Sequence, residues 1–440
     1  MISRFIFLFI LLVFTSTSYA AEYILDEQPT AESVEDVKGT LDQPDDVEEL
    51  ERVTDIIIEE DADFRSPFWK KSQLIANVRS YYFDRDSDLY QDSEAFALGG
   101  SLHYHSGWYK DVIKVNASIY TSQRLYGPED KDGTLLLRKG QHGLTTLGEF
   151  YVQAKLARNI EFKGFRQALN LPYLNKQDSR MIPNTFEAYT IAQRRSNSLL
   201  VAGYVDKMKK RNVIDFESMT DAAGLDGKDR GLYLVGGRYN FSENTDLGLI
   251  NYFTPDYINT FYAEANHLIR TKIPVRLSLQ ATKQRSNGDE LAGELDTYQL
   301  GGKLSFSYKN IVLTAAATST DEDGGIQKPF GGSPSYTSVM IEDFDRAGED
   351  AWSMRASYHF GRFGIKGLSV YTNYISGNTP ESGAAASSDQ KEWDMTIDYK
   401  PEKKKLDGLW LRLRRAKVDR DDGKDVLDYR IILNYGLNFS

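Results

Sequence analysis

From about residue 72 to the end of the chain, apolar and polar residues alternate with a period of two. The alternation is clearest in 113–121, 275–282, 298–308, 352–360, 393–399 and 429–439. A β-strand points successive side chains to opposite faces, so each of these segments has one apolar face and one polar, often charged, face. Repeated segments of about ten residues with this pattern are typical of a transmembrane β-barrel.

Eighteen such segments can be counted, and the connections between them alternate in length. Short connections lie near 107–111, 158, 194–197, 242–243, 270–273, 309, 362–365 and 401–406, and the longest near 123–145, 168–184, 208–230, 320–350 and 377–390. Short turns on one side and long loops on the other are the outer-membrane arrangement. The sequence therefore predicts an all-β fold, an antiparallel transmembrane barrel of 18 strands over residues 72–440.

Other architectures explain the pattern less well. A β-propeller would show a repeat of about 40–45 residues, and none is found. A soluble β-sandwich also alternates, but it does not need Tyr, Trp and Phe at both ends of so many strands. Beyond the first 20 residues no apolar run reaches the roughly 18–20 residues of a membrane helix. The absence of Cys excludes disulfides, thiolate metal sites and cysteine nucleophiles.

The N-terminal part has a different character. Residues 1–20 have a basic start, an apolar core and a small-residue ending at Ser18-x-Ala20, as in a cleaved secretory signal peptide. The segment 21–64 follows, and its residues 22–63 hold 17 acids and two bases, whereas 64–440 holds 50 bases and 47 acids. Such a composition predicts a flexible periplasmic segment. It is either a solvated linker or a plug that docks on a basic lumen.

The polar faces of the predicted strands carry many bases. A charge that faces hydrocarbon costs about 2–4 kcal/mol at mid-depth, so these side chains are expected to face a water-filled lumen. Arginines in a pore attract anions, and a guanidinium can hold a carboxylate through two hydrogen bonds. The alternative is that the arginines pair with lumen acids such as Glu392 and Asp394 and only stiffen the wall. By parity, the lumen set is Arg276, Arg355, Arg412, Arg414 and Arg430.

Several stretches together resemble the OprD family of substrate-specific outer-membrane porins. They are 79–83, 97–102, 120–123, 147–149, 165–167, 352–358, 409–415 and 428–430, with the long stretch Asp178-Ser-Arg-Met-Ile-Pro-Asn-Thr-Phe-Glu-Ala188 as the most specific. The resemblance covers about 72–440 and implies a monomeric barrel of eighteen strands, narrowed by its third and seventh loops. It also implies passive uptake of small carboxylate-bearing solutes along a row of lumen arginines. The acidic segment 22–63 departs from the family's short N-terminus.

The resemblance adds residues to the candidate site. It puts Arg166 on the lumen row, although parity with Ile160 and Phe162 aims this side chain at lipid. Either a bulge intervenes, for example at Gly164, or the strand has already left the membrane at this point. The two loops contribute the constriction candidates Asp178, Ser179, Arg180, Asn184, Asp321 and Asp323. Acids of the loop 320–350 could attract the cationic group of an amino acid, opposite the arginines.

These features favour one function over its competitors. We expect a substrate-selective channel of the Gram-negative bacterial outer membrane for amino acids or organic acids, and the alternative is an unselective diffusion porin. An enzyme and an adhesin are the other classes considered, and the five His form no catalytic constellation. No phosphate loop or dinucleotide fingerprint occurs, so we expect no cofactor, no metal and no nucleic-acid partner. The expected partners are outer-membrane lipid and the transported solute.

Overall fold

The computed structural model describes residues 68, 71–225, 227–401, 406 and 408–439. The predictions of a signal peptide in 1–20 and of an acidic periplasmic segment in 21–64 fall outside these residues. Among the residues described, no helix is long and apolar enough to cross a membrane. Their regular structure is strand, apart from α3 (Met219–Ala222) and the short 3-10 helices η1 (Glu129–Lys131) and η2 (Phe360–Phe363).

Eighteen long strands build the sheet, as the sequence predicted. They are β1 (Gln73–Ser87), β2 (Ser93–His105), β3 (Ile113–Tyr126), β4 (Leu144–Ala157), β5 (Ile160–Gln167), β8 (Thr185–Arg195), β9 (Ser198–Lys209), β11 (Leu232–Ser242), β12 (Thr245–Thr254), β13 (Ile258–Ile269), β14 (Val275–Ser286), β15 (Asp296–Tyr308), β16 (Ile311–Thr320), β17 (Asp350–His359), β18 (Leu368–Asn378), β19 (Gln390–Tyr399), β20 (Leu409–Arg420) and β21 (Val426–Asn438). Three two-residue strands lie in connections: β6 (Asn170–Leu171), β7 (Leu174–Asn175) and β10 (Glu217–Ser218).

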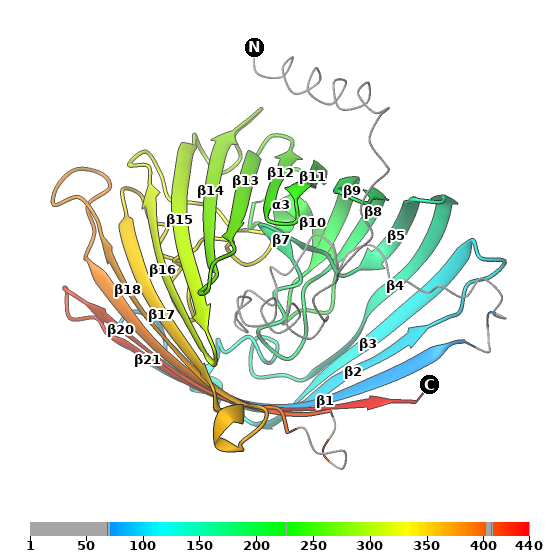
Figure 1. Ribbon diagram of the computed structural model, residues 1–440, viewed down its shortest axis with the longest axis horizontal. Helices are drawn as coiled ribbons and strands as arrows, with labels where there is room; N and C mark the ends of the chain where they lie inside the picture. Colours follow the sequence, from blue (N-terminus) through cyan, green and yellow to red (C-terminus); the bar gives the residue numbers. More distant parts are fainter. Residues whose placement is uncertain (1–67, 69–70, 226, 402–405, 407, 440) are drawn as a thin grey trace. The chain divides into compact units, whose positions relative to one another are not determined.

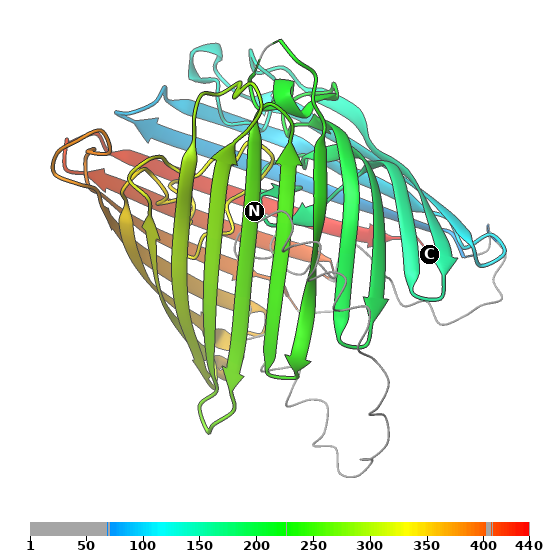
Figure 2. The same cartoon turned by 90° about the horizontal axis from the view of Figure 1, so that it is seen from above.

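The sheet closes on itself. Each long strand pairs antiparallel with the next one along the chain, and β1 pairs with both β2 and β21. Closure removes the exposed edges, so the backbone hydrogen bonds are satisfied within the sheet, as a bilayer requires. Figure 2 shows short turns joining neighbouring strands at one end, for example β13 to β14, and longer connections at the other end. We call these the short-turn end and the long-loop end.

The two faces of the wall differ as the alternation predicted. On β17, Trp352 and Met354 are 45% and 58% exposed, whereas Ser353 between them is 1% exposed. The exposed apolar side chains recur at every second residue around the sheet, so this is the outer, lipid-facing surface. The opposite face is polar and largely covered.

Two long connections cover the polar face from inside. One, between β5 and β8, contains the β6–β7 hairpin, and the other, between β16 and β17, spans residues 321–349. We call them loop 3 and loop 7. Figure 1 shows β7 within the ring of strands. The two loops are hydrogen-bonded to each other, because the Asn175 side chain donates to the Gly332 carbonyl (3.1 Å) and accepts from the Gly332 N–H (2.9 Å).

Candidate functional site

The arginines predicted for the lumen lie on the inner face of the wall. Arg276 is in phase with the buried Ser278 on β14, while Leu277 and Leu279 between and beyond them are exposed outward. The same comparison with exposed neighbours orients Arg355, Arg412, Arg414 and Arg430 inward.

Register connects two of these arginines, Arg355 and Arg276, with Arg85 of β1 in one row. Successive cross-strand partners run through Arg85, Asp428, Ala416, Asp394, Asn373, Arg355, Thr314, Ser305 and Arg276. Arg85 lies close to the long-loop end of β1, and Arg276 is the second residue of β14 at the short-turn end. Because barrel strands are tilted, a row perpendicular to them slopes along the barrel axis. The row therefore crosses the inner wall from one end toward the other.

Two arginines face each other directly beside this row. Arg414 of β20 and Arg430 of β21 are cross-strand partners, and like charges in that position repel. Arg430 is held by Asp428 at 2.8 Å, and its Nη2 also donates to the Met340 carbonyl of loop 7 at 3.1 Å. Asp428 also pairs with Arg85 at 2.7 Å, so one carboxylate serves two guanidinium groups.

The predicted arginines differ in access. Arg412, Arg414 and Arg430 are 7%, 7% and 2% exposed. Arg412 forms a bidentate pair with Asp398, at 2.8 and 2.9 Å. Because these three side chains are almost completely covered, a solute in the lumen would sense their charge without direct contact.

Arg355 and Arg276 are half-buried and more accessible. Nη2 of Arg355 donates to the Tyr336 and Ser338 carbonyls of loop 7, at 2.9 and 3.0 Å. Within the described part of the chain, Arg276 has no carboxylate within 4.0 Å. Among the residues that the structure describes, no acid therefore neutralises this guanidinium at contact distance.

Arg166 reaches its position through a local reversal of the strand. Phe165 has a left-handed φ of +89° and is 38% exposed on the outer face, so the next side chain turns the other way. Arg166 then pairs with Glu187 of β8 at 2.9 Å and lies over the Phe216 ring at 4.3 Å. The irregularity anticipated near Gly164 lies one residue further on.

The loop 3 candidates attach the loop to strand β1 and to two other long connections. Asp178 forms an ion pair with Arg79 of β1 at 2.7 Å, and the Ser179 hydroxyl accepts from Arg211 at 2.6 Å. Arg180 donates from Nε to the Thr134 carbonyl at 2.9 Å. Burial, and next the nearby Arg430, lower the pKa of Arg180 to about 9.

Asn184 also serves the geometry of loop 3. Its side chain donates to the Asn175 carbonyl at 3.3 Å, and its N–H donates to the Lys176 carbonyl at 2.6 Å. These two hydrogen bonds fix the path of loop 3 back toward β8. They also hold Asn175, which contacts loop 7.

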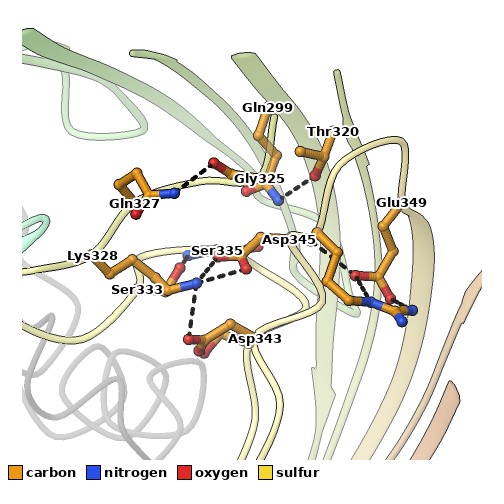
Figure 3. Close-up of polar contacts among 12 residues, drawn as sticks. Gln299, Thr320, Gly325, Gln327, Lys328, Ser333, Ser335, Asp343, Asp345 and Glu349 are labelled. Atoms are coloured by element: carbon orange, nitrogen blue, oxygen red, sulfur yellow. Dashed lines mark hydrogen bonds and ion pairs between the residues drawn. The ribbon is translucent and has the colours of Figure 1, made fainter. Parts of the chain in front are cut away.

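In loop 7 the predicted constriction acids, Asp321 and Asp323, lie apart from the acids that pair with Lys328. Asp321 continues the strand ladder, since its N–H donates to the Tyr298 carbonyl at 2.9 Å, and Asp323 is exposed at the long-loop end. The buried charges lie deeper in the loop, where Lys328 contacts Asp343 at 3.2 Å and Asp345 at 2.5 Å (Figure 3). Burial, with Asp343 as a second acid, raises the pKa of Asp345 to about 7, although Lys328 opposes the shift.

Two wall acids anchor loop 7 through its backbone. Glu392 accepts the N–H groups of Ile341 and Glu342, both at 2.8 Å, and Asp394 accepts that of Met340 at 3.2 Å. These acids were candidates for pairing with arginines, and the structure gives each of them partners in the backbone of loop 7. Arg79 and Arg85 of β1 are among the basic residues absent from the predicted set, and their strand carries Tyr81 and Phe83 on the same inner face.

Comparison with known proteins agrees with this geometry. The model of the OprD family of outer membrane porins matches residues 66–439. The fold matches Pseudomonas aeruginosa OccK9 (OpdG) at 25% identity, with a TM-score of 0.78 over 85% of this chain and 100% of that one. It also matches P. aeruginosa OpdK, solved with vanillate, at 23% identity and a TM-score of 0.77 over the same shares. Among curated proteins none matches.

The fold and the inner wall define a β-barrel channel of the Gram-negative outer membrane. The chain belongs to the OprD family of outer membrane porins. In such barrels the short turns face the periplasm and the long loops face the outside.

Proposed function

We propose that this porin is a substrate-selective channel for passive uptake of small solutes that carry a carboxylate. The observation that carries the proposal is the inward row of bases that ends at Arg276, whose guanidinium has no carboxylate at contact distance among the described residues. A solute carboxylate supplies the missing partner, and a guanidinium fork holds it through two hydrogen bonds.

Four acids of the inner wall already have partners within the protein. Asp428 and Asp398 are paired with arginines, and Glu392 and Asp394 accept loop amides. The preference for anions then depends on Arg276, whose guanidinium has no carboxylate within 4.0 Å among the described residues, because an unpaired positive charge in a pore favours anions over cations. The cross-strand pair of Arg414 and Arg430 also supports a preference for anions, because two like charges opposite each other do not stabilise a sheet.

The acids of loop 7 help to decide whether the solute is an amino acid or a simple organic acid. Asp343 and Asp345 share Lys328, and Glu349 pairs with Arg346 at 2.7 Å. Because these acids are engaged, they offer little to the ammonium group of an amino acid. We therefore favour simple organic acids over amino acids, and a monomeric barrel as the working unit.

Arg276→Gln tests the proposal without breaking an ion pair of the fold. At 4 Å one charge pair in water is worth about 1 kcal/mol, so uptake of an organic acid should fall about fivefold. The matched control is Arg285→Gln on the outer face of the same strand, where Asp296 keeps Lys283 as a partner. Proteoliposome swelling measures both against a neutral sugar of similar size.

Three outcomes separate the alternatives. Loss of organic-acid uptake in R276Q alone, with sugar uptake unchanged, supports the proposal. Equal entry of sugar and organic acid in the parent identifies an unselective diffusion porin. Faster entry of amino acids than of matched organic acids would overturn the preference for simple carboxylates.

A further inference from the structure

One arginine faces the opposite way from the lumen row. Arg415 follows Arg414 on β20 and therefore points to the outer surface. Its exposed outer-face neighbour on the short-turn side is Leu413, 38% exposed, and on the long-loop side are Lys417 and Asp419. Arg415 thus stands where the apolar band of the wall gives way to charged residues.

Two aromatic rings on the neighbouring strands flank this arginine. Its cross-strand partners are Met395 on β19 and Tyr429 on β21. The guanidinium carbon lies 5.4 Å from the centre of the Trp393 ring and 5.9 Å from that of Tyr429. Nε donates to the Tyr429 hydroxyl at 3.4 Å. Aromatic residues form girdles at the membrane interfaces of such barrels, so the three side chains lie at the headgroup level.

The aromatic frame is held in place. Trp393 donates from its indole N–H to the Thr372 hydroxyl at 2.8 Å, and that hydroxyl donates to the Asp394 carbonyl at 2.8 Å. Trp393 and Tyr429 remain 46% and 41% exposed on their outer faces. The guanidinium is therefore positioned by the wall while its Nη groups stay available.

The described residues offer Arg415 no acid at contact distance. In the described ranges, no carboxylate lies within 4.0 Å of its guanidinium. Lys417, by contrast, pairs with Asp419 and with Asp425 at 3.6 Å. On the lateral surface of a barrel, the available counter-charge is an anionic lipid headgroup.

We infer that Arg415, with Trp393 and Tyr429, forms a binding site for a lipid phosphate on the outer surface of the barrel. The site lies toward the long-loop end, so the ligand belongs to the outer leaflet, whose lipid is the phosphorylated glycolipid lipid A. The guanidinium binds two phosphate oxygens through its Nη groups, as Arg does in bidentate phosphate recognition. Lys391, exposed two residues from Trp393 on the same face, adds a second positive charge further out.

The test compares phosphorylated and dephosphorylated lipid A on the purified full-length barrel. Native mass spectrometry in detergent gives the bound fraction against lipid concentration. The parent should bind the phosphorylated form at least about tenfold tighter, and Arg415→Gln should lose that preference. Arg285→Gln is the matched control, since Arg285 is also outward-facing but already pairs with Asp296 at 2.7 Å. Uptake through R415Q should equal that of the parent.

Three results would overturn the inference. The parent binds both forms of lipid A equally, R285Q loses as much binding as R415Q, or phosphatidylglycerol binds as tightly as lipid A. The first comparison needs no substitution, so it decides the question even if R415Q fails to fold. Arg415→Lys keeps the charge without the fork, and binding between that of the parent and R415Q would support the bidentate geometry.

Discussion

The contact between loops 3 and 7 gives the sharpest test of how the lumen is narrowed. Asn175 is 1% exposed, and its amide makes two hydrogen bonds to the backbone of Gly332, at 3.1 and 2.9 Å. Asn175→Ala removes both. Each is worth about 0.5–1.5 kcal/mol, so the contact should weaken by about 1–3 kcal/mol, or about 5- to 150-fold in its equilibrium constant. The backbone bond from Asn175 to the Phe330 carbonyl remains.

Single-channel recording in a planar bilayer measures the consequence. Loops that separate more often should produce larger conductance or added current noise, together with weaker discrimination between an organic acid and a neutral sugar. Asn170→Ala is the control, because Asn170 is 8% exposed in the same hairpin and its side-chain oxygen has no hydrogen-bond partner. If N175A conducts like the parent, or if N170A shows the same change, the loop contact does not set the opening.

Three further predictions concern stability. Arg412→Ala leaves the buried Asp398 without its guanidinium and should cost about 3–5 kcal/mol, seen as a lower unfolding temperature in detergent and recovered in part when Asp398 is also removed. Because the pKa of Asp345 is raised to about 7, loop 7 should lose stability as pH rises from about 4 to about 7, and Asp345→Asn should abolish that dependence in hydrogen exchange. Gly367→Ala should destabilise the turn before β18 by more than about 1–2 kcal/mol in denaturant unfolding, since φ is +77° and a Cβ would lie 1.7 Å from the Lys400 carbonyl oxygen.

Strand number and facing were predictable because a barrel wall obeys one rule at every position. A side chain on the outer face meets hydrocarbon, so alternation alone predicted that Arg276 and Arg355 face inward, and in the structure Leu277 and Trp352 of the opposite parity are exposed. The same rule concealed Arg79 and Arg85. Their strand carries Tyr81 and Phe83 on its inner face, where loop 3 covers them, and this face therefore looks lipid-facing in sequence.

Contacts between distant segments could not be predicted from alternation. Glu392 and Asp394 show a polar face, but nothing local indicates that loop residues some fifty positions earlier donate to them. The hydrogen-bonded contact between Asn175 and Gly332 links residues 157 positions apart in the sequence, and it depends on how both loops fold inward. Register has the same limitation, because a slip of one residue turns every side chain to the other face and only packing selects among pairings.

The inner arginines fall into two sets, one suited to attracting an anion into the lumen and the other to binding its carboxylate. Arg412, Arg414 and Arg430 are nearly covered, so they act on a solute only through their field, which the ion pairs of Arg412 with Asp398 and of Arg430 with Asp428 reduce. Arg276 and Arg355 are partly exposed, and a carboxylate can reach them. A buried charge draws the anion in without holding it, whereas an accessible guanidinium binds it, and release stays easy only if that binding is weak. Substituting a covered arginine should therefore change ion selectivity with little effect on the concentration at which uptake saturates. Arg276→Gln should raise that saturating concentration.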